Sequence, residues 1–126
     1  MASAITWFQI PATDSARAKA FYETICGFEL LPLDAGPGME MWGFPSDWQQ
    51  GEVGGAIVTG EGAVPSATGT AVFLNANPDL QVMLDRVEGA GGTILMPKTE
   101  IGMEGAGHFA MITDTEGNTL GLHSQG

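Results

Sequence analysis

Basic residues are scarce in this 126-residue sequence: four lysines and arginines stand against fifteen aspartates and glutamates, for a formal net charge of −11. So acidic a surface repels the phosphate backbone of nucleic acids and the headgroups of anionic lipids. We therefore expect neither nucleic acid nor a membrane as a partner. Three of the cations, Arg17, Lys19 and Arg86, fall on predicted helices and are expected to face solvent, which leaves Lys98 as the one near a cleft.

Cysteine is equally scarce, because Cys26 stands alone and no disulfide can form within the chain. This usage is typical of a reducing compartment. No apolar run approaches the roughly 18 residues that a membrane-spanning helix needs, and the first residues lack a basic leader. These absences predict a cytoplasmic protein. With 44% hydrophobic residues in 126, we expect one domain with one core.

The first half of the chain has the pattern of one β-α-β-β-β unit. Thr13 or Asp14 can cap a helix whose apolar residues recur at i, i+3, i+4 and i+7. Gly27 can end it, because glycine adopts the left-handed conformation of a helix stop at low cost. Short β-rich runs separated by turn residues predict the strands. We expect strands at 4–10, 28–33, 39–44 and 52–59, and the helix stripe is Ala18, Phe21, Tyr22 and Ile25.

The same order of elements follows in the second half, with Asn77 and Pro78 as the predicted start of a second helix. Asp14 and Asp79 lie 65 residues apart, and Gly55 and Gly121 lie 66 apart, which indicates a tandem duplication. We predict a single domain over 1–126, made of modules 1–60 and 68–126 and a linker at 61–67. The remaining strands are expected at 70–75, 93–96, 108–113 and 118–123, and the stripe of the second helix is Leu80, Met83, Leu84 and Val87.

Four segments carry a family resemblance: residues 7–14 (WFQIPATD), 18–22 (AKAFY), 26–28 (CGF) and 114–118 (DTEGN). Together they resemble the vicinal oxygen chelate superfamily, the glyoxalase, bleomycin-resistance protein and dioxygenase domain. The resemblance covers nearly the whole chain. It implies an α+β fold of two tandem βαβββ modules whose curled mixed sheets enclose a cleft. It also implies a homodimer that completes or supports the site.

In metal-dependent members of this superfamily, the resemblance implies one divalent ion held by His, Gln or Glu from the first and last strands of both modules. Transferred residue by residue, those positions are Trp7, Val72, Gly55 and Gly121. None of these residues carries an imidazole, carboxylate or thiolate donor. A slip of two residues would bring Gln9 and His123 inward, and two donors make a poor site. We therefore expect no metal cofactor.

The two glycines are expected to leave room for an organic ligand where metal-binding relatives have side chains. Aromatic and thioether side chains with sparse polar groups are the usual composition of a small-molecule site. Segments 45–51 and 98–107 are candidates to close over such a cleft. Each side chain can also be a plain packing residue. The expected ligand-binding residues are Trp7, Gln9, Trp42, Trp48, Gly55, Val72, His108, Met111, Gly121 and His123, with Phe44, Met39 and Met41 in the same wall.

Three classes of function stay open on the sequence alone. We favour metal-free binding or sequestration of a small aromatic or cationic compound, as in the bleomycin-resistance relatives. The alternative is a glyoxalase-like lyase, isomerase or dioxygenase that uses a divalent metal or an acid–base residue such as His108 or His123. The third is an interaction domain without a ligand. No catalytic residue is assigned, and the sequence does not name the ligand.

Overall fold

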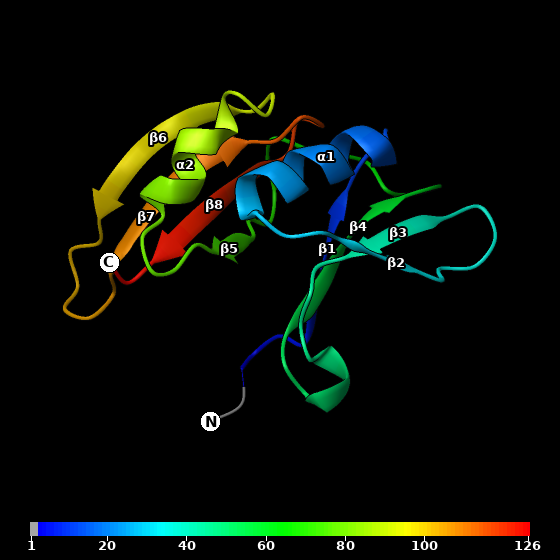
Figure 1. The fold of residues 1–126 in the computed structure, drawn as a ribbon, viewed down its shortest axis with the longest axis horizontal. Helices are drawn as coiled ribbons and strands as arrows, with labels where there is room; N and C mark the ends of the chain where they lie inside the picture. The colour runs from blue at the N-terminus through cyan, green and yellow to red at the C-terminus, as the bar shows by residue number, and fades with distance from the viewer. Residues whose placement is uncertain (1–2) are drawn as a thin grey trace.

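A computed structural model describes residues 3–126, which form two four-stranded sheets of the same topology (Figure 1). In the first sheet the strand order is β1-β4-β3-β2, and in the second it is β5-β8-β7-β6. Strands β1 and β4 are parallel, as are β5 and β8, and the other pairs are antiparallel. The predicted fold class, two βαβββ modules, is confirmed. The strands are β1 (Trp7–Pro11), β2 (Leu31–Leu33), β3 (Glu40–Gly43), β4 (Gly54–Thr59), β5 (Phe73–Asn75), β6 (Thr93–Glu100), β7 (His108–Thr113) and β8 (Thr119–Ser124).

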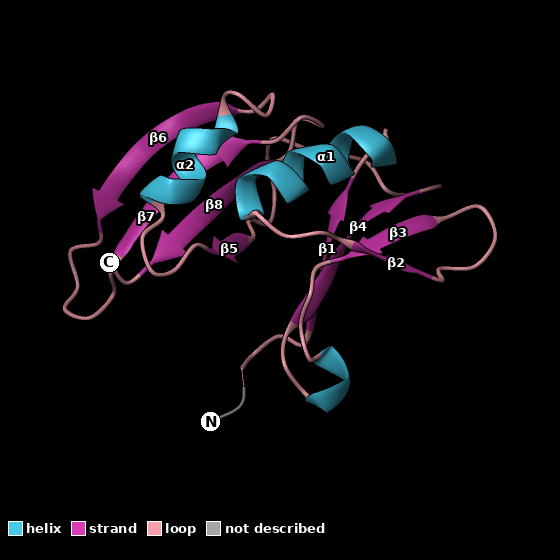
Figure 2. Cartoon of the chain, viewed as in Figure 1, coloured by secondary structure: helices cyan, strands magenta, loops and turns pink. Residues whose placement is uncertain are grey.

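Two α-helices, α1 (Ser15–Cys26) and α2 (Gln81–Val87), lie side by side and in contact (Figure 2), and a short 3-10 helix, η1, covers Trp48–Gln50. Neither α-helix in the described part of the chain is long and apolar enough to cross a membrane. Both helices pack into a single core that also takes residues from both sheets. Its fully buried members include Phe21, Tyr22, Leu80, Ile57 and Leu122. The two modules therefore share one hydrophobic core.

The limits of α1 agree with the sequence prediction. The Asp14 side chain accepts a hydrogen bond from the Arg17 amide at 3.0 Å, as an N-cap residue does. Gly27 has a φ of 78° and donates its amide to the Glu23 carbonyl, which ends the helix in the left-handed conformation. The stripe predicted to face the core, which includes Phe21 and Tyr22, is buried. Local sequence signals thus suffice for this helix.

The start of α2 differs from the prediction. The helix begins at Gln81, and the Gln81 amide is bound by the Asp79 carboxylate at 2.9 Å. Asn77 lies before the helix, where its side-chain oxygen accepts the Gln125 amide at 2.7 Å. The prediction that Asn77 caps this helix is therefore wrong. Asn77 instead holds the segment after β8 against the segment after β5.

Strand β6 is longer than predicted because it runs through Pro97 to Glu100. A proline lacks the amide that a central strand needs, so the sequence pattern ends at Met96. β6 is an edge strand, with β7 as its one neighbour in the sheet. Its pairing with β7 also shifts register on both sides of Met96. An edge position and an irregular ladder are both settings in which a strand tolerates proline.

The turn between β7 and β8, residues 114–118, docks the second module onto the first; we call it the docking turn. Its Glu116 carboxylate accepts the amides of Thr13 and Asp14, each at 2.9 Å, and the Arg17 Nε at 2.6 Å. The Glu116 side chain is 0% exposed. Burial by itself raises the pKa of Glu116, but the hydrogen bonds from Arg17, Asp14 and Thr13 outweigh it and lower the pKa from 4.5 to about 2.

Two further residues of the docking turn reach into the first module. Asp114 accepts the Tyr22 hydroxyl at 2.7 Å, and burial together with this carboxylate raises the pKa of Tyr22 well above its usual value. Asn118 donates its side-chain amide to the Pro11 carbonyl at 2.7 Å. The Asp-x-x-Gly-Asn motif of the resemblance is thus a joint between the modules. The polar side chains of this motif make hydrogen bonds to the other module, and buried polar groups need such partners.

We predict that Glu116→Gln lowers the free energy of unfolding by about 3–4 kcal/mol at neutral pH, since the pKa of Glu116 is lowered from 4.5 to about 2 and each unit corresponds to roughly 1.4 kcal/mol. A lowered folded-state pKa stabilises the fold above the unfolded value and ceases to do so as the pH falls. The wild type should therefore lose this advantage between pH 4.5 and about 2. Urea titrations at several pH values measure it. Glu61→Gln, at an exposed carboxylate, is the control, and equal effects of the two substitutions would contradict the prediction.

Candidate functional site

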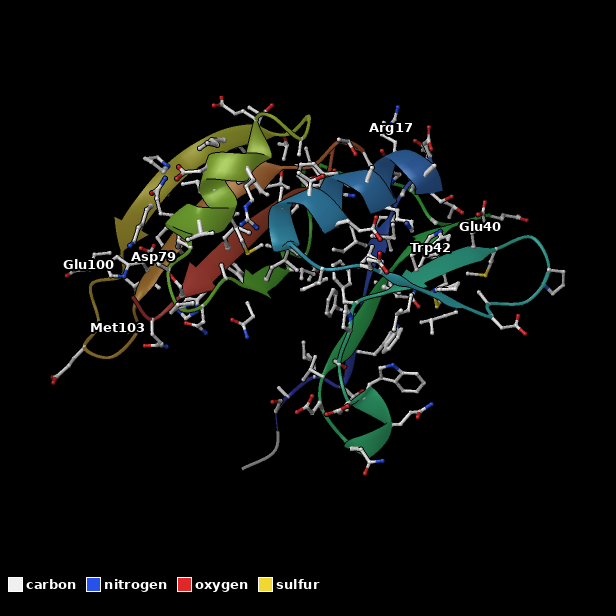
Figure 3. All side chains as sticks on the ribbon, in the orientation of Figure 1. Arg17, Glu40, Trp42, Asp79, Glu100 and Met103 are labelled. Carbon is white, nitrogen blue, oxygen red and sulfur yellow. The ribbon has the colours of Figure 1, made fainter. Side chains whose placement is uncertain are left out.

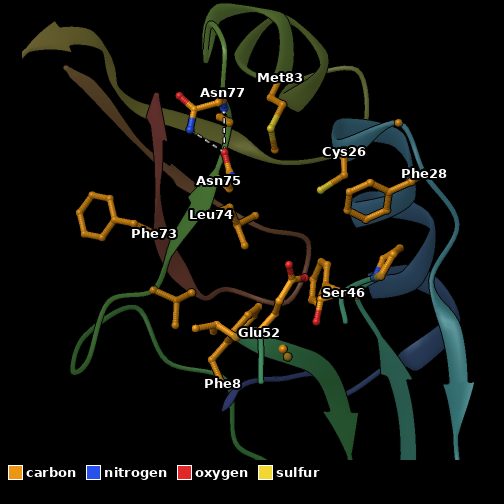
Figure 4. A pocket seen from close by; sticks show the side chains of 18 of the residues that line it. Phe8, Cys26, Phe28, Ser46, Glu52, Phe73, Leu74, Asn75, Asn77 and Met83 are labelled. Atoms are coloured by element: carbon orange, nitrogen blue, oxygen red, sulfur yellow. Dashed lines mark hydrogen bonds between the residues drawn. The ribbon is translucent and has the colours of Figure 1, made fainter. Parts of the chain in front are cut away.

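A cavity of about 1460 Å³ lies between the two modules (Figure 4). Its walls come from β1, β5, the segments on either side of η1, the end of α1 and one side of α2. The helix stop at Gly27 leaves Phe28 beyond the last turn of α1, where it lines the cavity beside Cys26. Leu74 on β5 points toward the helices, and Phe73, its neighbour, points the other way. The cavity thus opens at the edge strands β1 and β5 and is lined by residues from both faces of these strands. We call the helix-facing side of the sheets the inner side.

The apolar wall of the cavity is aromatic. The rings of Phe8 and Phe44 have their centres 5.5 Å apart, and Phe28 meets Phe44 edge-on at 6.4 Å. Such tilted and edge-on pairs are the favoured geometries of aromatic contacts. Leu74 and Met83 add aliphatic and thioether surface from the second module. The wall offers a flat, polarisable surface of the kind that binds aromatic ligands.

Polar side chains make up a smaller part of the lining, namely Gln9, Ser46, Glu52, Thr70, Asn75, Asn77, Asp79 and Arg86. The Ser46 Oγ is buried and has no hydrogen-bond partner among the described residues. Asn77 donates its side-chain amide to Asn75 at 2.9 Å, and Arg86 lies at the wall formed by α2. Cys26 is a poor nucleophile, because burial raises the pKa of its thiol to about 12 and the reactive thiolate does not form at neutral pH.

Strand register divides the predicted ligand-binding residues between two faces. On β1, Phe8 and Ile10 pack toward the core, so Trp7 and Gln9 face the opposite side, which we call the outer side. Trp48 stacks edge-on against Trp7 at 5.8 Å. Trp42, labelled on β3 in Figure 3, faces the inner side, where the Lys19 ammonium lies 4.9 Å from its ring. Trp42 and Trp7 therefore do not share a site.

The second sheet divides the predicted residues in the same way. Phe73 pairs with Gly121 and Gly121 with Met111, and all three are on the outer side, as is His123. His108 shares strand parity with the buried Ala110 and faces the inner side. The two histidines are thus on opposite faces. Of the ten predicted residues, four line the cavity, namely Trp7, Gln9, Gly55 and Val72; a ligand role for any of the ten stays a prediction.

From the sequence, Gly55 of the first module is matched to Gly121 of the second, and the structure shifts this correspondence by one residue. The Gly54 amide donates to the Thr6 carbonyl at 3.1 Å, and the Gly121 amide donates to the Val72 carbonyl at 2.8 Å. Gly54, and not Gly55, is therefore the structural counterpart of Gly121. Because side chains alternate along a strand, this difference places Gly55 on the inner side and Gly121 on the outer side.

The space beside each glycine is filled by the chain itself. A Cβ atom on Gly55 would collide with the ring of Phe8, and one on Gly121 would collide with the ring of Phe73. These are the residues that pair with the glycines in the parallel ladders. The expectation that both glycines are small to leave room for a ligand is therefore wrong. They accommodate phenylalanine rings from the neighbouring strands.

The residues present do not fit a divalent metal of the kind that the superfamily implies. Among the described residues no group of three or more His, Cys, Asp or Glu side chains is placed to hold an ion. The imidazole of His123 has its Nε2 2.7 Å from the Ala106 carbonyl oxygen. The outer side of the first and last strands of each module presents Trp7, Gln9, Gly54, Ala56, Phe73, Asn75, Gly121 and His123, a set with one common metal ligand.

The two segments expected to close over the site differ in position. Pro45 and Ser46, from the first, line the cavity. None of residues 98–107 does so. Met103 lies in the connection after β6, is 70% exposed, and projects away from the first sheet in Figure 3.

Sequence reasoning missed Phe8, Phe28 and Arg86, which all line the cavity. The signal for Arg86 was its spacing, because it follows Met83 by three residues and such residues share one face of a helix. A basic side chain on the apolar face of a helix indicates that it contacts a polar group of the protein or a ligand. Phe8 and Phe28 carry no comparable signal, since each resembles an ordinary core residue.

Comparison with known proteins identifies the family. The family model of the Glyoxalase/Bleomycin resistance protein/Dioxygenase superfamily matches residues 4–122. The chain therefore belongs to this superfamily. It is 30% identical, over 121 residues, to a protein named "Putative glyoxylase CFP32" in Mycobacterium bovis and Mycobacterium tuberculosis. The match covers 92% of this chain and 43% of that protein, so the chain spans less than half the length of these curated relatives.

Solved structures share the fold. TnmS3, an antibiotic binding protein from a Streptomyces species, has a TM-score of 0.70 and 24% identity, with 97% of this chain and 95% of that chain covered. A glyoxalase I mutant from Zea mays has a TM-score of 0.72 and 17% identity, with 95% of this chain and 45% of that chain covered. At these identities the likeness concerns the fold.

We predict that Gly55→Ala destabilises the protein more than Gly121→Ala. Phe8 is half-buried against the core and must shift at a cost of about 1–3 kcal/mol, whereas Phe73 is 50% exposed and can rotate into solvent. Urea unfolding of both variants measures the difference. A second substitution, Phe8→Leu, should restore part of the stability lost in Gly55→Ala. Equal losses for the two glycines, without this restoration, would show that the rings do not set the requirement.

Proposed function

We propose that this protein binds a small aromatic molecule in the cavity between its modules and does so without a metal ion. The observation that carries the proposal is the cavity itself, which has a volume of about 1460 Å³ and an aromatic wall of Phe8, Phe28 and Phe44. Small-molecule sites are commonly clefts lined mainly by apolar and aromatic side chains, with polar groups that orient the ligand. The unpartnered Ser46 Oγ supports it further, because a buried hydroxyl without a partner is satisfied when a ligand supplies one.

The superfamily includes both binding proteins and enzymes. In this protein the geometry of the cavity favours binding over catalysis. Neither His108 nor His123 lines the cavity, and the two rings are on opposite sides of the second sheet. The thiol of Cys26 is protonated at neutral pH. The antibiotic-binding protein from Streptomyces supports a binding role through its fold. A glyoxalase-like activity, suggested by the name of the longer mycobacterial relatives, has no matching set of groups among the described residues.

We predict that chelator-treated protein binds a neutral probe, 2-naphthalenemethanol, measured by calorimetry. The Ala71→Trp substitution introduces a large side chain into the cavity lining and should weaken this binding at least about tenfold, since it removes the space that the ring needs. Ala67→Trp, at an exposed position outside the lining, is the matched control and should leave binding unchanged.

Two results would contradict the proposal. Binding that appears after addition of zinc, nickel, iron or manganese and vanishes with chelator would restore the metal-dependent alternative. Equal binding by the wild type and both tryptophan variants would place the site outside the cavity. A thermal unfolding scan of each variant establishes that it is folded.

We also propose that two copies associate through the outer sides of their sheets. Leu31, Phe73 and Met96 are exposed there, and apolar surface on a sheet without a covering layer favours association. A second copy is the occupant that the superfamily resemblance implies. The lone, half-buried Cys26 supports a cytoplasmic location for this assembly.

Sedimentation equilibrium at micromolar concentration is expected to give twice the chain mass of 13.1 kDa. Phe73→Glu places a charge on the outer side, away from the shared core, and should shift the population toward the single chain. A single 13.1 kDa species for the wild type would contradict this proposal and leave the ligand cavity unaffected.

A further inference from the structure

Arg86 differs from the other three basic residues of the chain. Arg17 pairs with Glu116 at 2.6 Å, Lys19 with Glu23 at 3.0 Å, and Lys98 with Asp79 at 2.9 Å. Arg86 has no carboxylate partner within residues 3–126, although the chain carries fifteen acidic residues and four basic ones. In so acidic a protein an unpaired arginine is the exception, and this one lines the cavity.

The guanidinium of Arg86 keeps most of its hydrogen-bonding capacity. Its Nη1 donates one long hydrogen bond, 3.4 Å, to the Ile25 carbonyl at the end of α1. A guanidinium carries five N–H donors in a planar fork that matches a carboxylate or a similar anion. The neighbouring thiol of Cys26 is protonated and therefore supplies no counter-charge. The charge of Arg86 is thus available to a ligand.

The acidic residues that line the cavity are bound to other groups. Asp79 accepts the Lys98 ammonium and the Gln81 amide through Oδ1, and these contacts lower the pKa of Asp79. Glu52 accepts the Asp47 amide at 3.0 Å. Neither carboxylate makes an ion pair with Arg86. Asp79 is thus neutralised by Lys98, Glu52 keeps its negative charge beside η1, and Arg86 is the unpaired cation among the described lining residues.

We propose that the ligand of the cavity is an aromatic anion, in which a ring lies against Phe8, Phe28 and Phe44 and an acidic group pairs with Arg86. The proposal rests on the proposed function and specifies its ligand class. It replaces the cationic compound named as an alternative in the sequence analysis, because the guanidinium of Arg86 has no carboxylate partner among the described residues. A planar carboxylate or sulfonate suits the fork of the guanidinium, and a ring joined to it suits the wall.

Three probes with one ring system test the ligand class by calorimetry at neutral pH: 2-naphthoate, neutral 2-naphthalenemethanol and the cation 2-naphthylmethylammonium. We expect the affinity to fall in that order, with the anion about tenfold tighter than the alcohol, as for one charge-assisted hydrogen-bonded pair at a partly exposed site. Arg86→Gln should abolish the advantage of the anion over the alcohol. Arg86→Lys should keep part of the advantage, since the charge remains.

A control separates the local charge from the overall charge. Lys19→Gln removes one positive charge on α1 outside the cavity lining, and it should not alter the order of the three probes. If the alcohol and the anion bind equally, or if Arg86→Gln leaves the anion unaffected in a folded protein, the ligand class is wrong and the proposed function stands. If none of the three probes binds the wild type, both proposals are wrong.

Discussion

The carboxylate of Glu116 is the contact on which the arrangement of the two modules depends. This carboxylate is buried, it accepts hydrogen bonds from the backbone amides of Thr13 and Asp14 at the start of α1, and it forms an ion pair with Arg17. A buried carboxylate is stable only when its oxygens are bound, and this one is bound by the other module. Asp114 and Asn118 extend the same joint to Tyr22 and Pro11, so one five-residue turn fixes a helix and a strand of the first module.

The cavity is a consequence of that joint. Docking places α1 and α2 next to each other over a core shared by both sheets, and α1 ends at Gly27 before it covers the space between β1 and β5. The rings of Phe8 and Phe28 and the guanidinium of Arg86 border this uncovered space. The binding proposed here therefore belongs to the space between the edge strands β1 and β5 and the two helices. The outer side offers few metal donors and exposed apolar surface.

Local patterns predicted much of the fold, and long-range contacts explain most of what they missed. Asp14 and Gly27 mark the ends of α1 because their signals act within one helical turn. The face to which each strand residue points was less predictable, since a shift of one residue moves every side chain to the other face of the sheet. The sequence spacing matched Gly55 to Gly121, whereas the structure matches Gly54 to Gly121. The cavity could not be predicted from local patterns, because it depends on a contact between Glu116 and Asp14, which are about a hundred residues apart in sequence.

The most direct test uses the methionine methyl groups, which are distributed over both sides of the sheets. In chelator-treated protein with methyl-labelled methionine, addition of 2-naphthalenemethanol should shift the NMR signal of Met83, which lines the cavity. The signals of Met41 and Met111, on the outer sides of the two sheets, should stay in place. Shifts of Met41 and Met111 with an unchanged Met83 would put the ligand on the outer side and contradict the account.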